Sequence, residues 1–250
     1  MMWRLLIDDK PAHWQMALDE AILLLRDRGF SPNTLRLYVF RPSAVTIGYF
    51  QKMSEAVNLE YIKQLDISVV RRITGGGAVY HDEKGEVTYS VIADLKSFPR
   101  DILESYKLIC GGLVKSLEYL GLKASYMPIN DVVVNGKKIS GSAQIRRGKS
   151  LLQHGTLMYN TDLEILGKVL TAPRAKLENH RVKSITERVT TVSKELGVNV
   201  KKKEVLNAMI NGFEEALNIK LVKGKLLEEE KRLASELAKK YESGEWTYKR

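Results

Sequence analysis

The 250-residue sequence has few of the features that mark several common classes of protein. It contains one cysteine, Cys110, which excludes an internal disulfide and any metal site built from several cysteines. The longest purely apolar run near the N-terminus, residues 21–25, is far too short to span a bilayer, and residues 1–10 carry two aspartates rather than a signal-peptide core. We therefore expect a cytoplasmic protein without a membrane partner.

The sequence also lacks the usual signatures of nucleotide-binding and nucleic-acid-binding proteins. It has neither a Walker A loop nor a GxGxxG fingerprint. The net charge of +10 indicates an anionic partner, but no RNP pattern, zinc-finger spacing or basic heptad array accompanies it, so no nucleic acid is expected. Residues 136–183 hold ten Lys/Arg against three Asp/Glu, which predicts a basic surface near a site.

Hydrophobic periodicity predicts a single α+β domain over residues 1–250, with a mixed β-sheet and flanking helices. Strands are expected at residues 3–7, 34–40, 44–48, 67–70, 87–93, 131–134, 137–140, 151–157 and 219–222. Helices are expected at residues 14–28, 59–65, 101–120, 162–170, 202–217 and 226–241. Strand 34–40 alternates apolar and polar residues, which predicts half burial. Thr161 is the expected cap of the next helix, and residues 184–187 have capping-box spacing.

Residues 71–82, RRITGGGAVYHD, form the most informative stretch. β-rich runs lie on both sides, so residues 74–77 are expected to form a tight loop between two strands. Consecutive glycines remove every Cβ, allow positive φ, and let backbone N–H groups approach a ligand closely. Beside Arg71 and Arg72 such a loop indicates anion binding, although three glycines alone would equally suit a plain hairpin.

A second stretch, residues 130–144 (NDVVVNGKKISGSAQ), surrounds a predicted hairpin. The Asn-Gly dipeptide is a strong signal for the turn, and Lys138 follows it. A lysine on a hairpin is a rigidly placed point charge, suited to a carboxylate and an α-phosphate together, whereas Lys137 is expected to be solvated. Asp131 is interpreted either as a Mg²⁺ ligand or orienting group, or as an ordinary hydrogen-bonding residue at a strand start.

These two stretches together resemble the lipoate–protein ligase A family, within the wider group of biotin and lipoate ligases and lipoyltransferases. The matching residues are 71–82, 130–131, 136–144 and 153–157 (QHGTL), and residues 14–20 resemble the family's opening helix. The resemblance extends from about residue 3 to residue 246, and the glycine motif followed by KISGSAQ is its most specific part.

The resemblance implies a biotin/lipoate-ligase-type catalytic domain and a two-step reaction that uses ATP and Mg²⁺. Lipoate attacks the α-phosphate of ATP, which gives lipoyl-AMP and pyrophosphate. A lysine of an acceptor lipoyl domain then takes the lipoyl group and releases AMP. The implied acceptors are the acyltransferase subunit of a 2-oxoacid dehydrogenase or the glycine cleavage carrier protein.

The resemblance also implies roles for individual residues, with Lys138 as the catalytic residue. The implied ATP contacts are Arg72, Gly75, Gly76, Gly77, Ala78, Val79, Tyr80 and Lys138. The implied lipoate contacts are Met16, Leu18, Arg72, His81, Lys138 and His154. Asp131 is the one implied Mg²⁺ ligand.

Three alternatives are weighed against this interpretation. Octanoyltransferases of the same group need no ATP and carry the acyl group on a cysteine just upstream of the strand that matches 131–134, but residues 123–129 (KASYMPI) hold none and Cys110 is expected to be buried in a helix. A biotin ligase-like enzyme would also join Asn-Asp to a lysine after a turn, with a different glycine loop. A basic binding module without catalytic activity is the third alternative.

The C-terminal end of the sequence suggests a further partner. Many members of the family continue past a Trp-containing segment into a small accessory domain, and residues 246–250 lie about where that domain would begin. We therefore expect the short form of the ligase, with a separate small accessory protein. A basic face is expected to attract acidic acceptor domains, and its residues are Arg146, Arg147, Lys149, Arg174, Lys176, Arg181 and Lys183.

Overall fold

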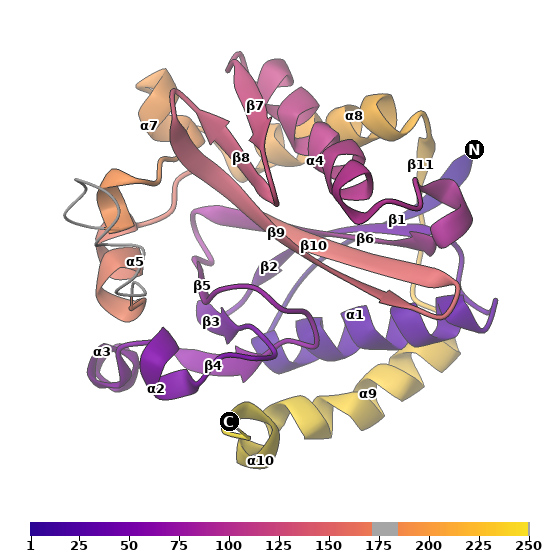
Figure 1. Ribbon diagram of the computed structural model, residues 1–250, viewed down its shortest axis with the longest axis horizontal. Helices are drawn as coiled ribbons and strands as arrows, with labels where there is room; N and C mark the ends of the chain where they lie inside the picture. The colour runs from indigo at the N-terminus through magenta and orange to yellow at the C-terminus, as the bar shows by residue number, and fades with distance from the viewer. Residues whose placement is uncertain (172–184, 250) are drawn as a thin grey trace.

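The computed structural model describes residues 1–171 and 185–249, and it has three layers (Figure 1). A large mixed sheet forms the middle layer. Helices α4 (Ile102–Tyr119) and α8 (Lys202–Leu217) cover one face, and α1 (Ala12–Asp27) and α9 (Glu228–Glu242) cover the other. The expected α+β class, with a mixed sheet and flanking helices, is confirmed.

The large sheet has eight strands in the order β11-β1-β2-β6-β10-β9-β8-β7. Strand β1 pairs in parallel with β11 and β2, and the remaining neighbours are antiparallel. The strands are β1 (Met2–Lys10), β2 (Thr34–Phe40), β6 (Glu86–Asp94), β7 (Ala124–Met127), β8 (Asp131–Val134), β9 (Lys137–Arg147), β10 (Ser150–Met158) and β11 (Lys220–Lys223).

A separate small sheet carries the glycine motif. Its order is β4-β3-β5, so β3 (Ala44–Ile47) lies between β4 (Ser68–Arg71) and β5 (Val79–His81). The glycine loop therefore passes from one edge of this sheet to the other and does not close a hairpin. The shorter helices are α2 (Met53–Ala56), α3 (Leu59–Gln64), η1 (Leu95–Ser97), α5 (Leu163–Val169), η2 (Ile185–Glu187), α7 (Val192–Leu196) and α10 (Gly244–Thr247).

Strand β2 departs from the prediction of half burial, because all seven of its residues are buried. Its apolar side chains Leu35 and Leu37 face α4 and α8, as the alternation predicts. The opposite face is covered by α1, and there Arg36 is fully buried in an ion pair with Asp19. Here the buried carboxylate of Asp19 balances the charge of the arginine.

Several local signals act as the sequence predicts, and one does not. Asn135 and Gly136 both have positive φ, as a two-residue hairpin turn requires. Asp162, not Thr161, caps α5, since its carboxylate accepts from the amides of Glu164 and Ile165. The capping-box prediction at residues 184–187 extends outside the described residues, as do Arg174, Lys176, Arg181 and Lys183. No described helix is both long and apolar enough to cross a bilayer.

The packing of α4 on α8 depends on glycines that let the two helices approach closely. A Cβ at Gly112 would lie 2.4 Å from the ring of Phe213, which is fully buried. At the neighbouring Gly111 the nearest atom would be the Ala216 Cβ at 3.8 Å, an ordinary contact. Two adjacent glycines of one helix therefore face very different surroundings.

We predict that Gly112→Ala lowers the free energy of unfolding by about 1–3 kcal/mol, because the new methyl group forces the Phe213 ring to move. Gly111→Ala is the matched control and should raise it by up to about 1 kcal/mol, through the higher helix propensity of alanine. Urea unfolding of both variants measures the difference. Equal effects of the two substitutions would contradict this account of the packing.

Candidate active site

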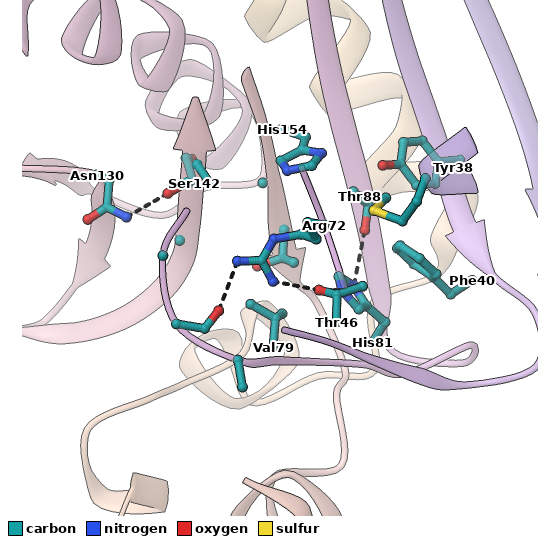
Figure 2. A pocket seen from close by; sticks show the side chains of 18 of the residues that line it. Tyr38, Phe40, Thr46, Arg72, Val79, His81, Thr88, Asn130, Ser142 and His154 are labelled. Atoms are coloured by element: carbon teal, nitrogen blue, oxygen red, sulfur yellow. Dashed lines mark hydrogen bonds between the residues drawn. The ribbon is translucent and has the colours of Figure 1, made fainter. Parts of the chain in front are cut away.

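A cleft with about 540 Å³ of empty space lies where the two sheets meet, and residues far apart in the sequence line it (Figure 2). Strand β2 supplies Tyr38 and Phe40, β9 supplies Lys138, and β10 supplies His154. The glycine loop closes one side. Of the residues that the sequence predicts for the site, the lining includes Met16, Arg72, Gly76, Gly77, Ala78, Val79, His81, Lys138 and His154.

Four of the predicted site residues lie outside this lining. Leu18 is fully buried in the core between α1 and the sheet, because it follows Met16 by half a helical turn. Tyr80 points into the core of the small sheet, since its neighbours in the strand face the cleft. Gly75 borders a separate hollow beside Trp246. Asp131 touches the site only through Lys138.

The shape of the glycine loop depends on two positions. Gly76 has φ +94°, a conformation that L side chains rarely adopt. A Cβ at Gly48, just after β3, would lie 2.0 Å from the carbonyl oxygen of Gly76, so only glycine fits beneath the loop. Sequence reasoning missed Gly48, because its requirement comes from a contact with a loop nearly thirty residues away. At Gly77 a Cβ would meet open space.

Arg72 is buried and its guanidinium contacts no carboxylate among the described residues. Nη1 donates to Thr46 Oγ1 at 2.8 Å, Nε to Thr74 Oγ1 at 3.3 Å, and Nη2 to the carbonyls of Gly75 and Gly77, both at 2.9 Å. Burial lowers the pKa of the Arg72 guanidinium to about 10. The group therefore stays charged at neutral pH, and one of its five N–H donors, on Nη1, has no acceptor in the described chain.

The backbone of the same loop adds further donors. In a planar trans peptide the N–H points away from the preceding C=O. Because Gly75 and Gly77 turn their carbonyls towards Arg72, the amides of Gly76 and Ala78 point away from the guanidinium. In the described part of the chain the amides of Gly76, Gly77 and Ala78 have no acceptor, and all three residues line the cleft. This arrangement is typical of an anion-binding loop.

Lys138, on β9, also lines the cleft. Its Nζ lies 2.6 Å from Asp131 Oδ1, and its side chain crosses Gly141, where a Cβ would come within 2.6 Å of Nζ. Its backbone is held by the segment after η2, since Lys138 N donates to Arg188 O and Thr190 N donates to Lys138 O. The side chain of Lys138 is 40% exposed, so its pairing with Asp131 is open to solvent.

The two histidines of the site are both buried and both paired with carboxylates. His81 Nδ1 lies 2.7 Å from Glu86 Oε2, and its ring stacks on Phe40 with centroids 3.9 Å apart. His154 Nδ1 lies 3.0 Å from Asp19 Oδ2. Burial lowers the pKa of His154, against the opposing effect of Asp19, so the imidazole is neutral at pH 7.

Asp131 lies outside any group of three or more possible metal ligands in the described part of the chain. No group of three or more His, Cys, Asp or Glu side chains that could hold a metal ion occurs among residues 1–171 and 185–249. The Asp131 carboxylate instead pairs with Lys138, which supports the interpretation of Asp131 as an orienting group. A dedicated protein site for Mg²⁺ does not fit these residues.

Cys110 lies in α4, fully buried, as the sequence predicts. Its sulfur lies 3.7 Å from Ser142 Oγ and 3.6 Å from Gln153 Nε2. Burial raises the pKa of the thiol to about 11, so almost no thiolate is present at neutral pH. The only cysteine of the chain is therefore a poor nucleophile.

Sequence reasoning did not single out several residues that shape the site. Thr46 and Thr74 bond to Arg72, Tyr38 and Phe40 line the inner end of the cleft, and Asp19 and Glu86 pair with the histidines. Thr74 lies within the glycine motif and could have been noticed there. The others lie on α1, β2, β3 and β6, and nothing in their local sequence marks them.

Comparisons with known proteins agree on one family. Residues 11–214 match the model of the lipoyl protein ligase A/B catalytic domain. A curated relative from Kyrpidia tusciae, the octanoyltransferase LipM, is 36% identical and is covered over 99% of both chains. The structure also superposes on the bi-partite lipoate protein ligase of Thermoplasma acidophilum, described with its E2 lipoyl domain, with a TM-score of 0.86, 38% identity and coverage of 99% and 96%. A lipoate-protein ligase A bound with ATP gives a TM-score of 0.85 at 36% identity, with coverage of 99% of both chains.

The lowered pKa of His154 predicts how stability depends on pH. The unfolded histidine binds a proton near pH 6.5, whereas the folded one binds it only at lower pH. The free energy of unfolding should therefore be unaffected by His154 above pH 7 and should fall as the pH drops below 6.5, by up to about 1.4 kcal/mol per pH unit. Urea unfolding at several pH values measures this slope. His154→Gln should flatten it between pH 6.5 and 5.5; a wild-type slope in this variant would contradict the assignment.

Proposed function

Because the chain belongs to the lipoyl protein ligase A/B catalytic-domain family, we propose that it activates lipoate with ATP and transfers the lipoyl group to a lysine of an acceptor lipoyl domain. In the first step a carboxylate oxygen of lipoate attacks the α-phosphorus of ATP, and pyrophosphate leaves with the electron pair of the broken P–O bond. In the second step the acceptor amine attacks the lipoyl carbonyl, loses a proton and expels AMP.

The observation that carries the proposal is the buried charge of Arg72, which faces the cleft without a carboxylate in contact. An unbalanced buried charge is costly, and a bound anion would supply the missing negative charge. The free amides of Gly76, Gly77 and Ala78 point to the same kind of ligand. A cation and several N–H donors around one cavity suit a phosphate group better than any neutral ligand.

Lys138 is well situated to act on both reacting groups. It lines the same cleft as the glycine loop, and its ammonium pairs with Asp131. Negative charge accumulates on the α-phosphoryl oxygens as the lipoate oxygen attacks. Lys138 and Arg72 would stabilise that charge from two sides, in a site already organised for it. The approach of the two anions, lipoate and ATP, also needs a cation between them.

The inner end of the cleft supports a ligand with an apolar tail. Met16 and Phe40 lie in one hydrophobic cluster with Tyr38, and all three line the cleft. All three side chains are buried. A ligand with a charged head at Arg72 and Lys138 and an apolar tail against these side chains has the chemistry of lipoate.

Mg²⁺ enters the proposal only as the usual companion of ATP. The described carboxylates do not form a resident site for it, so we assign no step and no protein ligand to the metal. Asp131 is proposed instead as the residue that orients Lys138.

The second candidate is acyl transfer without ATP, which the identity to an octanoyltransferase favours. Such a reaction needs a nucleophile that carries the acyl group. Cys110 is the one cysteine of the sequence, and its burial and raised pKa make it unsuited to that role. Ligation through an adenylate needs no protein thiol, and for this reason we prefer it.

The partners follow from the same similarity. The related Thermoplasma ligase is bi-partite and is described together with an E2 lipoyl domain. We therefore propose a lipoyl domain as the acceptor and a second small polypeptide as an accessory of this chain. Of the predicted basic face, Arg147 lies on the hollow beside Trp246 and Arg146 bonds to the carbonyls of Pro99, Arg100 and Asp101.

We predict that Lys138→Ala lowers the rate of lipoate-dependent pyrophosphate exchange into ATP by about 10²–10³-fold, the usual effect of removing a preorganised electrostatic group. Stability should hardly change, because the side chain is 40% exposed. Lys137→Ala is the matched control on the same hairpin and should keep the wild-type rate. A normal exchange rate in Lys138→Ala, or an equal loss in both variants, would contradict the assigned role.

A second prediction separates the two candidate functions. Cys110→Ala should retain lipoylation of an acceptor domain and should lower the free energy of unfolding by about 1 kcal/mol, since it leaves a small cavity in the core. Mass spectrometry of the wild-type protein, incubated with an octanoyl donor, should detect no thioester on Cys110. An acyl-Cys110 adduct, together with loss of transfer in Cys110→Ala, would instead establish the transferase.

A further inference from the structure

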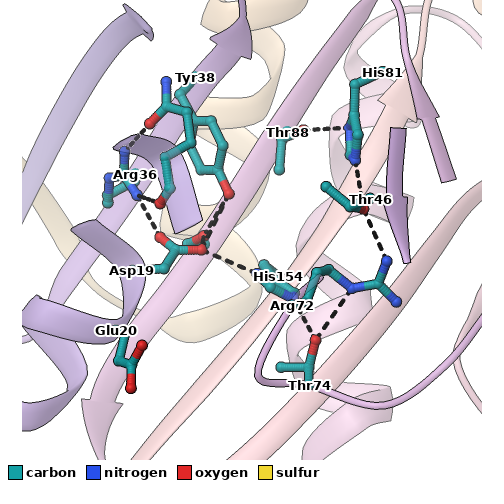
Figure 3. Close-up of polar contacts among 12 residues, drawn as sticks. Asp19, Glu20, Arg36, Tyr38, Thr46, Arg72, Thr74, His81, Thr88 and His154 are labelled. Atoms are coloured by element: carbon teal, nitrogen blue, oxygen red, sulfur yellow. Dashed lines mark hydrogen bonds and ion pairs between the residues drawn. The ribbon is translucent and has the colours of Figure 1, made fainter. Parts of the chain in front are cut away.

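Arg72 lies between two threonine hydroxyls, and each hydroxyl continues through a histidine to a carboxylate (Figure 3). Two such chains of hydrogen bonds therefore meet at one guanidinium. We call them the Glu86 relay and the Asp19 relay, after the carboxylates at their far ends. Every side chain in both relays is buried.

The Glu86 relay runs from β3 through β5 to β6. Arg72 Nη1 donates to Thr46 Oγ1 at 2.8 Å, and Thr46 Oγ1 lies 2.9 Å from His81 Nε2. His81 Nδ1 lies 2.7 Å from Glu86 Oε2, and the other carboxylate oxygen accepts from Thr88 at 2.5 Å. The relay thus ends on a carboxylate whose oxygens are both hydrogen-bonded.

The Asp19 relay repeats this order on the other side of Arg72. Arg72 Nε donates to Thr74 Oγ1 at 3.3 Å, and Thr74 Oγ1 lies 2.7 Å from His154 Nε2. His154 Nδ1 lies 3.0 Å from Asp19 Oδ2. Arg36, Ser90 and Tyr38 also bond to this carboxylate, and they hold Asp19 in place. Charge and hydrogen bonds from Arg36 and His154 lower the pKa of Asp19 against the effect of its burial, so Asp19 is ionised.

The direction of the bonds in these relays follows from the groups at their two ends. An ionised carboxylate can only accept, so Nδ1 of a neutral histidine carries the proton and donates it to the carboxylate, which leaves Nε2 as an acceptor. A guanidinium can only donate, so each threonine oxygen accepts from Arg72 and donates its own hydrogen to Nε2.

From this geometry we infer that Thr46 and Thr74 are positioning residues, and that the two relays hold Arg72 in its ligand-binding orientation only while both histidines are neutral Nδ1–H tautomers. The relays bring two negative charges towards Arg72 without letting a carboxylate touch it. A direct ion pair would occupy the guanidinium and compete with the ligand, whereas hydroxyl acceptors leave the charge and one N–H available. This inference rests on the proposed function, since it states how the proposed anion site is kept ready.

Protonation of either histidine would break its relay. Nε2 would become a donor, so the threonine hydroxyl would lose the acceptor of its own hydrogen, and a second positive charge would lie near the guanidinium. Adenylation should therefore fall as the pH drops below the range in which His154 is neutral. Titratable and charged groups surround both histidines. Glu86 and Asp82 lie near His81, and Asp19 lies beside His154 with Arg36 and Tyr38 on its far side. Arg72 and Lys138 line the cleft.

The test compares valine and serine at both threonines. Valine keeps the shape and removes the hydroxyl, whereas serine keeps the hydroxyl and removes a methyl group. Thr46→Val and Thr74→Val should each lower lipoate-dependent pyrophosphate exchange by about 10²-fold, as expected when a binding group is displaced. Thr46→Ser and Thr74→Ser should keep most of the exchange rate and its decrease at acidic pH. They create small cavities, so they should be less stable than the valine variants. If the threonines had a purely structural role, the serine variants, which lose a methyl group, should lose more activity than the valine variants.

Thr34 provides a matched control outside the site. It is also fully buried on a strand, and its Oγ1 accepts from Nε of a buried arginine, Arg4, at 3.1 Å. Thr34→Val should lower stability to a similar extent as the two site variants and should leave pyrophosphate exchange unchanged. A comparable loss of exchange in Thr34→Val would attribute the effect at Thr46 and Thr74 to general destabilisation and would overturn the inference.

Nitrogen NMR of the imidazole rings tests the relays without relying on activity. The sequence contains four histidines, so the signals of His81 and His154 can be assigned with His→Gln variants. Both should be Nδ1–H tautomers at pH 7.5, and each valine variant should change only the histidine of its own relay. An Nε2–H tautomer at either position, or valine variants with wild-type exchange, would overturn the inference. Absence of any exchange by the wild-type protein, with the expected tautomers present, would reject the proposed function and leave the relays standing.

Discussion

The guanidinium of Arg72 is the group on which the rest of the site depends. It is buried, it is charged at neutral pH, and no carboxylate in the described chain touches it. Such a charge is tolerated because hydroxyls and carbonyls satisfy four of its five donors. Asp19 and Glu86 also lie nearby, each separated from Arg72 by one threonine and one histidine. The fold provides these partners from the glycine loop and from strands that meet only in the tertiary structure.

The neighbouring arginine shows how differently one residue type is used a single position away. Arg71 points to the other side of the small sheet and donates to the carbonyls of Gly48, Tyr49, Gln51 and Thr247. It thereby ties α10 to the turn that supports the glycine loop, and Trp246 Nε1 donates back to its carbonyl at 2.8 Å. One arginine therefore fixes the loop and the other faces the cleft. Successive side chains along an extended strand point to opposite faces, and this alternation separates the two roles.

The family to which this chain belongs includes both ligases and acyltransferases, and the structure suggests why one scaffold serves both. A charged head group, an apolar slot and an incoming acceptor lysine are common requirements of the two reactions. What distinguishes them is the activated acyl group, either a thioester or an adenylate. In this chain the loop amides and Arg72 suit a phosphate, and the sole thiol is buried behind Ser142, outside the lining of the cleft, with its pKa raised to about 11.

The sequence by itself determined the long helices and most strands of the large sheet, the Asn-Gly turn, and the two motifs that supply Arg72, the glycine loop and Lys138, because each depends on local periodicity or on residues adjacent in the chain. It could not distinguish Met16, which lines the cleft, from Leu18, which packs in the core, because both are apolar positions of one helix. It also gave no sign that Arg36 lies inside the molecule or that Gly48 supports the glycine loop. The relays around Arg72 join α1, β3, β5, β6 and β10, so only the order of the strands and the packing of α1 on the sheet could decide them.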